Sequence, residues 1–133
     1  MTTHTDAVVD ATVLVADDDE GVRTLVTILL RRAGYQVVQA ANGREALDTV
    51  RDRGNEIDTV LLDVLMPEMD GHDTLPAVRG VEPKMPVIFI SGFDQNEVAD
   101  HLTGTEAHTS FLPKPFENAE LLAEVRRAVH SRR

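Results

Sequence analysis

The sequence predicts an α/β domain in which helices cover both faces of a parallel β-sheet. Short, nearly unbroken apolar runs, most of them rich in β-branched residues, predict strands that are buried on both faces. Segments with helical periodicity lie between these runs, and this alternation is typical of repeated βαβ units. With 133 residues, 42% of them apolar and 27% charged, the chain has the size and composition of one soluble globular domain.

Five strands are expected, one at each apolar run. The runs cover residues 12–16, 35–39, 59–62 and 87–90, and a shorter one covers residues 110–112. The run at 35–39 is the weaker of the first four. Because the others show little alternation of polar and apolar side chains, we expect them to be parallel strands inside the domain rather than half-exposed ones.

The first helix is expected between the first two strands. Its apolar residues recur at the spacing of one helical face, and they are Val22, Leu25, Val26 and Leu29. We expect this stripe to face the sheet. Gly34 follows the pattern, and glycine commonly ends a helix because it adopts the left-handed conformation without strain. The first helix is therefore predicted to end just before Gly34.

The other helices are expected after each of the following strands, which makes five helices in total. Asn42 and Gly43 are typical of a helix start and predict the second helix. The third is expected near residues 72–79, with a kink or a late start, because Pro76 lacks a backbone N–H to donate. The last helix follows the apolar spacing of Leu121, Leu122, Val125 and Val129.

Composition excludes several classes of function. A formal net charge of −10 would repel the phosphate backbone of a nucleic acid, so no nucleic-acid partner is expected. The absence of cysteine excludes a disulfide framework, a thiol nucleophile and a Cys-ligated zinc site. No apolar run is long enough to span a membrane, and the first residues lack a leader pattern, so we expect a cytoplasmic protein without membrane contact. Residues 1–11 are expected to be a flexible N-terminal segment and residues 12–133 the domain.

Polar residues follow four of the strands at the end where such a sheet binds its ligand. They are Asp17, Asp18, Asp63, Ser91 and Lys114. Three carboxylates at one edge repel one another, and a hard divalent cation with oxygen ligands relieves that repulsion, Mg²⁺ fitting best. A lysine and a serine hydroxyl beside the cation would bind a further anion. The pattern therefore predicts a site for a phosphoryl group.

Each of these residues also has a purely structural interpretation. The acids at positions 17–20 precede a helix, and carboxylates are favourable near the N-terminal end of a helix dipole. Ser91 is followed by glycine, which is a common turn signal, and a single lysine such as Lys114 usually lies on the surface. Asp63 is the hardest to explain in this way, because an unpaired charge at the end of a buried strand is costly.

Four motifs occur in order along the chain, namely VLVADDD at 13–19, LLDVLMPEMDG at 61–71, VIFISG at 87–92 and FLPKPF at 111–116. With these motifs the chain resembles the receiver domains of two-component response regulators, in the single-domain form of the chemotaxis receivers. The resemblance covers roughly residues 12–129. It implies a flavodoxin-like (CheY-like) fold, with a five-stranded parallel sheet in the order 2-1-3-4-5.

The resemblance also implies a role for each site residue. Asp63 would be the phosphoacceptor, which takes a phosphoryl group as an acyl phosphate. Asp17 and Asp18 would bind Mg²⁺, with Mn²⁺ as an alternative, together with Asp63 and the backbone carbonyl of Val64. Three further residues would act on the phosphoryl group or respond to it: Lys114 by contact, Ser91 as the switch hydroxyl and Phe111 as the aromatic switch. The Lys114–Pro115 peptide is expected to be cis, as in the family.

The function implied is that of a signalling module rather than an enzyme with a separate substrate. It would catalyse its own phosphorylation from a sensor histidine kinase or histidine phosphotransfer protein, and lose the phosphoryl group slowly. A downstream protein would bind the face formed by the fourth helix, the fifth strand and the fifth helix. We expect the module to act without an effector domain in the same chain, as a monomer or as a dimer that depends on phosphorylation, in two-component signalling or a phosphorelay.

Three other functions fit the same fold. A Mg²⁺-dependent aspartyl phosphatase would use Asp63 as nucleophile, but such enzymes carry a second aspartate two residues later, where this chain has Leu65. A pseudo-receiver would bind partners without being phosphorylated, and the presence of all five site residues argues against it. A flavin-binding module would need a phosphate-binding loop after the first strand, where this chain has four consecutive acids.

Overall fold

The computed structural model describes residues 11–64, 71–91 and 108–132, and for residues 71, 72 and 91 it describes the backbone only. Within these ranges five strands form one parallel sheet in the order β2-β1-β3-β4-β5. The strands are β1 (Thr12–Ala16), β2 (Gln36–Ala40), β3 (Thr59–Asp63), β4 (Val87–Ser91) and β5 (Thr109–Pro113). The predicted fold class and strand order are confirmed, and each strand lies within one residue of its expected position.

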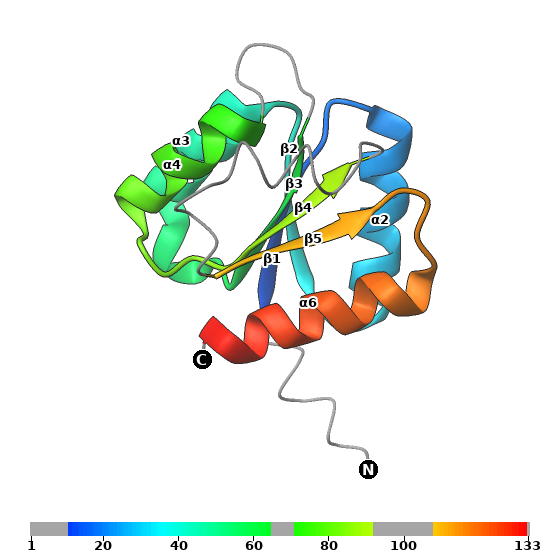
Figure 1. Ribbon diagram of the computed structural model, residues 1–133. Coiled ribbons are helices and arrows are strands. Elements are labelled where there is room, and N and C mark those ends of the chain that lie inside the picture. The colour runs from blue at the N-terminus through cyan, green and yellow to red at the C-terminus, as the bar shows by residue number, and fades with distance from the viewer. Residues whose placement is uncertain (1–10, 65–70, 92–107, 133) are drawn as a thin grey trace.

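The helices lie on both faces of this sheet (Figure 1). They are α2 (Glu20–Arg32), α3 (Gly43–Arg53), α4 (Gly71–Val81) and α6 (Asn118–Arg132), with a short 3₁₀ helix, η2 (Gly54–Glu56), after α3. We expected five helices, and the described residues contain four α-helices. The remaining one, expected between β4 and β5, falls in residues 92–107, outside the described part of the chain. No helix in the described ranges is long and apolar enough to cross a membrane.

Two apolar clusters hold the layers together, one on each face of the sheet. Leu14 and Ala16 of β1 point into the cluster that α3 and α4 cover, and Val13 and Val15 point into the one that α2 and α6 cover. All four side chains are at most 2% exposed. A strand buried on both sides cannot alternate polar and apolar residues, which explains the unbroken apolar runs in the sequence.

The helix ends follow the expected capping residues. Asn42 precedes α3, and its side chain accepts a hydrogen bond from the backbone N–H of Glu45 at 2.8 Å. Asp19 does the same for α2, accepting from the N–H of Val22 at 3.1 Å. Gly34 follows the end of α2 with a φ of 103°, a conformation that favours glycine. The predicted end of α2 and the predicted start of α3 are confirmed.

Two details of the helices differ from expectation. Helix α4 begins at Gly71 and continues through Pro76 to Val81, so it has no late start, and the alternative, a kink at Pro76, stays a prediction. Only one intrahelical acceptor, the carbonyl of His72, loses its donor there. In α2, Leu25 is 68% exposed although its spacing placed it on the stripe facing the sheet. The buried residues of α2 are Val26, Thr27 and Leu30, and Val22 and Leu29 are partly buried against the same cluster. The buried face is therefore rotated from the predicted stripe toward Thr27 and Leu30, which leaves Leu25 exposed.

Polar contacts join the elements at the amino end of the sheet. Arg79 of α4 donates hydrogen bonds to the carbonyl oxygens of Met85 and His108 and to Oγ1 of Thr109, at 3.0, 2.8 and 2.8 Å. Arg132 of α6 donates to the carbonyl oxygen of Gly54 at 3.1 Å and to Glu82 at 3.2 Å. These two arginines tie α4 and α6 to the segments that enter the sheet.

The first strand is fixed at the same end of the sheet. The carboxylate of Asp58 accepts a hydrogen bond from the backbone N–H of Thr12 at 2.8 Å. Ala11, the last residue of the expected flexible segment, is buried, and its carbonyl accepts from the N–H of Gln36 at 2.9 Å. The rest of that segment, residues 1–10, lies outside the described residues, so its flexibility stays a prediction.

Candidate functional site

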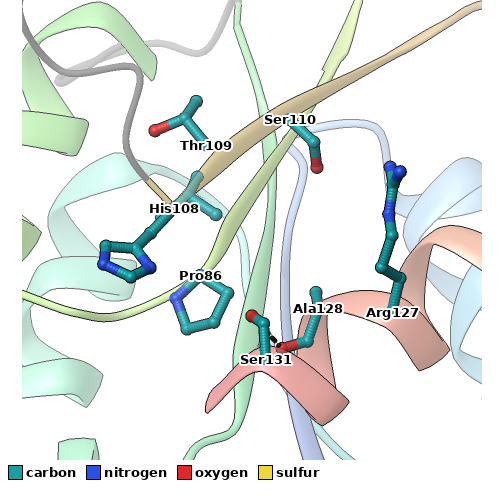
Figure 2. A pocket seen from close by; sticks show the side chains of 8 residues that line it. Pro86, His108, Thr109, Ser110, Arg127, Ala128 and Ser131 are labelled. Carbon is teal, nitrogen blue, oxygen red and sulfur yellow. Dashed lines mark hydrogen bonds between the residues drawn. The ribbon is translucent and has the colours of Figure 1, made fainter.

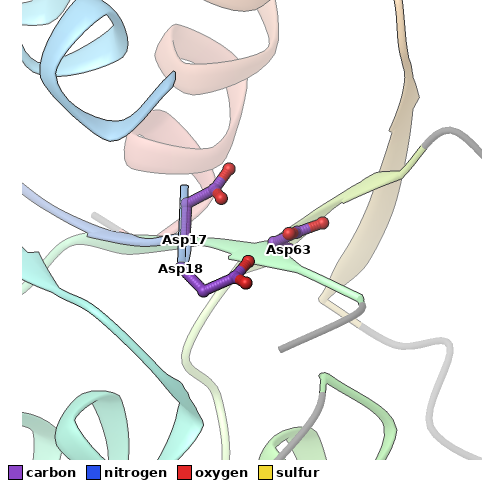
Figure 3. Close-up of side chains that lie close together, drawn as sticks. All are labelled: Asp17, Asp18 and Asp63. Carbon is purple, nitrogen blue, oxygen red and sulfur yellow. The ribbon is translucent and has the colours of Figure 1, made fainter. Parts of the chain in front are cut away.

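Three carboxylates meet at the carboxyl end of the sheet. Asp17 and Asp18 directly follow β1, and Asp63 is the last residue of β3, the strand beside β1. Each offers a carboxylate oxygen within 4.8 Å of the others, and Figure 3 shows the three side chains gathered at this edge. Within the described ranges this is the one group of three or more acidic, histidine or cysteine side chains close enough to share a metal ion.

Hydrogen bonds fix the backbone around Asp17, the most buried of the three acids at 4% exposure. Its N–H donates to the carbonyl oxygen of Ala40 at 3.1 Å, and its carbonyl oxygen accepts from the guanidinium of Arg23 at 2.7 Å. Its carboxylate accepts from the N–H of Asp19 at 2.9 Å, which closes the turn into α2. Asp18, in contrast, is exposed at the rim of the site.

Lys114 reaches the same site from the far side of the sheet. It follows β5, the edge strand that is separated from β3 by β4. Its Nζ lies 3.7 Å from Oδ2 of Asp17 and 3.8 Å from Oδ1 of Asp63. The Lys114–Pro115 peptide is cis, as expected. One cation therefore faces two carboxylates without forming a close bidentate pair with either.

The electrostatics of the site make Asp63 hard to ionise. Burial is the largest cause and, with the negative charge of Asp17, raises the pKa of Asp63 from about 3.8 to about 6. Asp18 raises this pKa further, whereas Lys114 and a hydrogen bond from the N–H of Val64 lower it. The single lysine does not balance the three acids, so a further cation bound here would stabilise the ionised form.

The donor set fits a magnesium ion. Mg²⁺ prefers carboxylate oxygens, uses few of them and retains several waters, and an exposed residue such as Asp18 leaves room for that water. The expected fourth contact, the carbonyl of Val64, follows directly after Asp63, and the N–H of Val64 is fixed by the carbonyl of Ile90 at 3.2 Å. The roles of Asp17, Asp18, Asp63 and Val64 as metal ligands stay predictions.

The two expected switch residues differ in how fully they are described. Ser91 ends β4 opposite Pro113, which puts its backbone at the correct edge of the sheet, and its side chain lies outside the description. Phe111 lies in β5 opposite Phe89, half-buried against the apolar cluster beneath α3 and α4. Their proposed switching roles stay predictions. Leu65 lies outside the described residues.

The structural interpretation of the acids at 17–20 is also correct in part. Asp19 is the residue that caps α2, while Asp17 and Asp18 face the site. The sequence analysis did not identify Arg23, whose guanidinium contacts the backbone of Asp17. Its only sequence signal is its place in the first turns of the helix that follows the acids, where an arginine ordinarily indicates a solvated surface.

Two pockets lie away from the acids. One, of about 410 Å³, lies between α2 and the start of α6 and includes Leu25, Leu29, Lys114 and Phe116 in its lining. The other, of about 300 Å³, lies at the opposite end of the sheet, where Figure 2 shows Ser110 of β5 on one side and Ala128 and Ser131 of α6 on the other. No carboxylate lines either pocket. The acid cluster is therefore the best candidate for chemistry.

Comparison with known proteins gives one family. The sequence model of the response regulator receiver domain family matches residues 13–126. The sensor kinase CckA of Brucella abortus is 40% identical over 122 residues, which cover 92% of this chain and 13% of that protein. The transcriptional regulatory protein CpxR of Escherichia coli K12 is 38% identical over 115 residues, covering 86% of this chain and 47% of that protein. The chain thus spans less than half the length of these curated relatives.

Solved structures agree with this result. The chemotaxis protein CheY4 of Vibrio cholerae superposes with a TM-score of 0.80 at 33% identity, covering 89% of this chain and 98% of that one. The receiver domain of the hybrid histidine kinase CckA superposes with a TM-score of 0.76 at 34% identity, covering 90% and 99%. Both matches extend over nearly the whole of the compared domain.

Proposed function

This chain belongs to the family of response regulator receiver domains, and from that we propose that it accepts a phosphoryl group on Asp63 and passes the signal to a protein partner. The strongest support for Asp63 as the phosphoacceptor is its position in the structure. Its carboxylate ends a central strand, next to two further acids and 3.8 Å from the only lysine in the described site. A nucleophile, a set of metal ligands and a phosphate-binding cation therefore occupy one edge of the sheet.

The proposed reaction is an in-line displacement at phosphorus. A carboxylate oxygen of Asp63 forms the new P–O bond while the P–N bond of a phosphohistidine breaks, and the leaving imidazole nitrogen takes up a proton. The attacking oxygen must be ionised. Because the pKa of Asp63 is about 6, most of the carboxylate is ionised above that pH, and a bound cation would extend this range downward.

The neighbouring residues supply position and charge. Mg²⁺, when bound by Asp17, Asp18, Asp63 and the Val64 carbonyl, would neutralise charge on the phosphoryl oxygens. Lys114 would hold another of these oxygens, which its place between Asp17 and Asp63 allows. Burial of Asp63, whose side chain is 12% exposed, limits the water that competes for the reacting phosphorus.

The proposed output is a change of packing next to the site. The Ser91 hydroxyl would bind the phosphoryl group, and Phe111, half-buried in β5, would move inward with it. The partner would bind the face that includes β5, α6 and the residues between β4 and β5. The proposed donor is a sensor histidine kinase or a histidine phosphotransfer protein, which agrees with the similarity to CckA, named a sensor kinase. We also propose that the protein is cytoplasmic and that it acts as a monomer or as a dimer that forms on phosphorylation.

The test is the mass of the intact protein after incubation with acetyl phosphate and Mg²⁺. We expect the wild type to gain one phosphoryl group, and Asp63→Asn to gain none. The matched control is Asp58→Asn, at the other end of β3, where the amide oxygen still accepts from Thr12, and it should gain the group as the wild type does. A wild type that stays unmodified, or a gain that persists in Asp63→Asn, would overturn the proposal in favour of a pseudo-receiver or another acceptor.

A further inference from the structure

We propose that Arg23 is a positioning residue for the metal site, which holds the Asp17–Asp18 peptide so that both carboxylates face Asp63. The inference rests on the proposed function, because it concerns the affinity of that same site for Mg²⁺. Arg23 lies on α2 and does not contribute a ligand atom. Its effect would come through the backbone of the two aspartates.

The guanidinium of Arg23 joins two elements that border the site. One of its terminal nitrogens donates to the carbonyl oxygen of Asp17 at 2.7 Å, and its Nε donates to Oε1 of Gln39 in β2 at 3.2 Å. The first bond is short and charge-assisted, the stronger kind of hydrogen bond. The second anchors the guanidinium to the edge strand, so the arginine cannot swing away from the loop without losing both contacts.

The bond to Asp17 fixes a peptide plane that no regular secondary structure holds. On the amino side of Asp17, the N–H pairs with Ala40 and continues the ladder between β1 and β2. On the carboxyl side the strand has ended, and the Asp17 carbonyl pairs with Arg23. A rotation of this peptide would turn Asp18 away from Asp17 and Asp63, so Arg23 opposes the motion that would take the three acids apart.

Asp18 depends on this arrangement more than its neighbours do. The Asp17 carboxylate is held by the N–H of Asp19, and the Asp63 carboxylate by its place at the end of a buried strand. The Asp18 carboxylate is exposed, and within the described residues it accepts no hydrogen bond. No hydrogen bond of its own orients it, so its placement depends on the position of its backbone, and Arg23 is the side chain that bonds to the peptide leading into it.

Charge and positioning make opposite predictions for Arg23. A positive side chain near a cation site repels the cation, so removing the charge would by electrostatics alone strengthen Mg²⁺ binding. If Arg23 instead orients the ligands, its removal weakens binding, as loss of groups that hold metal ligands ordinarily does. The sign of the change in affinity therefore separates the two effects.

The experiment is a titration of the unphosphorylated 133-residue chain with Mg²⁺ alone, in which binding is measured by calorimetry and by the amide NMR shifts of residues 17–19. For Arg23→Gln we expect Mg²⁺ affinity to fall roughly 10-fold, the lower end of the range for such supporting residues. Arg23→Lys keeps the charge and one donor, and should lie between Arg23→Gln and the wild type. The matched control is Arg31→Gln, on the same helix, whose side chain donates to the Val37 carbonyl at 3.4 Å and should leave Mg²⁺ affinity unchanged.

Equal or tighter Mg²⁺ binding by a folded Arg23→Gln variant would overturn the inference. Gln39→Ala provides a second test in case that variant is unfolded, because it removes only the outer anchor of the guanidinium from an exposed strand position. It should weaken Mg²⁺ binding by a smaller factor, and an unchanged affinity would count against the role of Arg23. A wild type that does not bind Mg²⁺ at all would instead contradict the proposed metal site, which keeps the two failures distinct.

Discussion

The two ends of the sheet use charged side chains in opposite ways. At the carboxyl end, three carboxylates share one lysine, and burial raises the pKa of Asp63 to about 6. At the amino end, Arg79 and Arg132 each reach more than one acceptor, and Asp58 accepts from the backbone of β1. At the carboxyl end the three carboxylates therefore have too little positive charge beside them, whereas at the amino end the charged side chains have hydrogen-bond partners.

This difference assigns stability to the amino end of the sheet and function to the carboxyl end. Polar groups at the amino end are held by hydrogen bonds that join helices to strand entries, and losing a donor there leaves acceptors unsatisfied. The acids at the carboxyl end destabilise the unliganded fold, because they are brought together without sufficient compensation. Substitutions at the amino end should therefore change stability and leave chemistry intact, while those at the carboxyl end should change chemistry and can increase stability.

The largest effect on stability is expected from Arg79→Met. The substitution keeps much of the aliphatic packing but removes the donors to the carbonyls of Met85 and His108 and to Thr109. We expect the free energy of unfolding to fall by about 3 kcal/mol, since several partly buried acceptors lose their partner. Chemical denaturation measures this loss, and Mg²⁺ affinity should not change. The control is Arg51→Met, an exposed ion pair with Asp48, which should change stability by much less.

Lys114→Gln is the corresponding change at the carboxyl end, with an effect on rate rather than on folding. The variant loses the cation that faces Asp17 and Asp63, so the rate of phosphorylation by acetyl phosphate should fall about 100-fold, as when a single donor to a transition-state oxygen is removed. Mg²⁺ affinity should be equal or higher, because a positive charge has gone. Time-resolved intact mass gives the rate, with Lys84→Gln, the other lysine, as control. A normal rate would show that Lys114 does not contact the phosphoryl group.

Asp63→Asn should stabilise the unphosphorylated, metal-free protein above pH 6. At about 1.4 kcal/mol per pKa unit, the rise of the Asp63 pKa from 3.8 to about 6 corresponds to about 3 kcal/mol, which solvent screening at this partly open site reduces to about 2 kcal/mol. The sign follows from proton binding. Between pH 3.8 and 6 the folded state holds a proton on Asp63 that the unfolded state has lost, so wild-type stability falls as pH rises through this window. The advantage of the variant should therefore disappear near pH 4.

Denaturation midpoints from pH 4 to pH 8 test this prediction, and saturating Mg²⁺ should remove the advantage by stabilising the wild type. Asp48→Asn, an exposed aspartate on α3, serves as the control and should show little change at any pH. An advantage of Asp63→Asn that stayed constant across the pH range would contradict the assignment of the effect to ionisation.

Arg132→Gln should have the smallest effect. The side chain is 18% exposed and donates to Glu82 and to the Gly54 carbonyl, so the loss should be about 1 kcal/mol, near the upper end for a partly exposed ion pair. Thermal unfolding at low and high salt measures it. Because glutamine retains a donor for the carbonyl, the salt-dependent part of the stability should fall while the remainder changes little. A decrease in phosphorylation would contradict the separation of the two ends of the sheet.

Most of the fold could be predicted because its signals are local. Strands buried on both faces require unbroken apolar runs, and capping by Asn42 and Asp19 depends on a side chain and a backbone N–H three residues later. The convergence of Asp17, Asp18 and Asp63 follows from parallel strands, whose carboxyl ends meet at one edge. Leu25 was misplaced because its exposure depends on how far the sheet and α6 extend around α2, which helical spacing alone does not specify.

The fold class, the strand order through the family resemblance, and the edge at which the site residues gather could all be inferred from the amino-acid sequence. How these residues interact became visible in the folded chain: Lys114 lies 3.7 and 3.8 Å from two acids, Asp63 is buried enough to raise its pKa, and Arg23 bonds to the Asp17 backbone. The physical reason is that periodicity and strand ends are properties of neighbouring residues. Burial, pKa and the reach of an arginine depend on elements that are distant in the chain and meet only after folding.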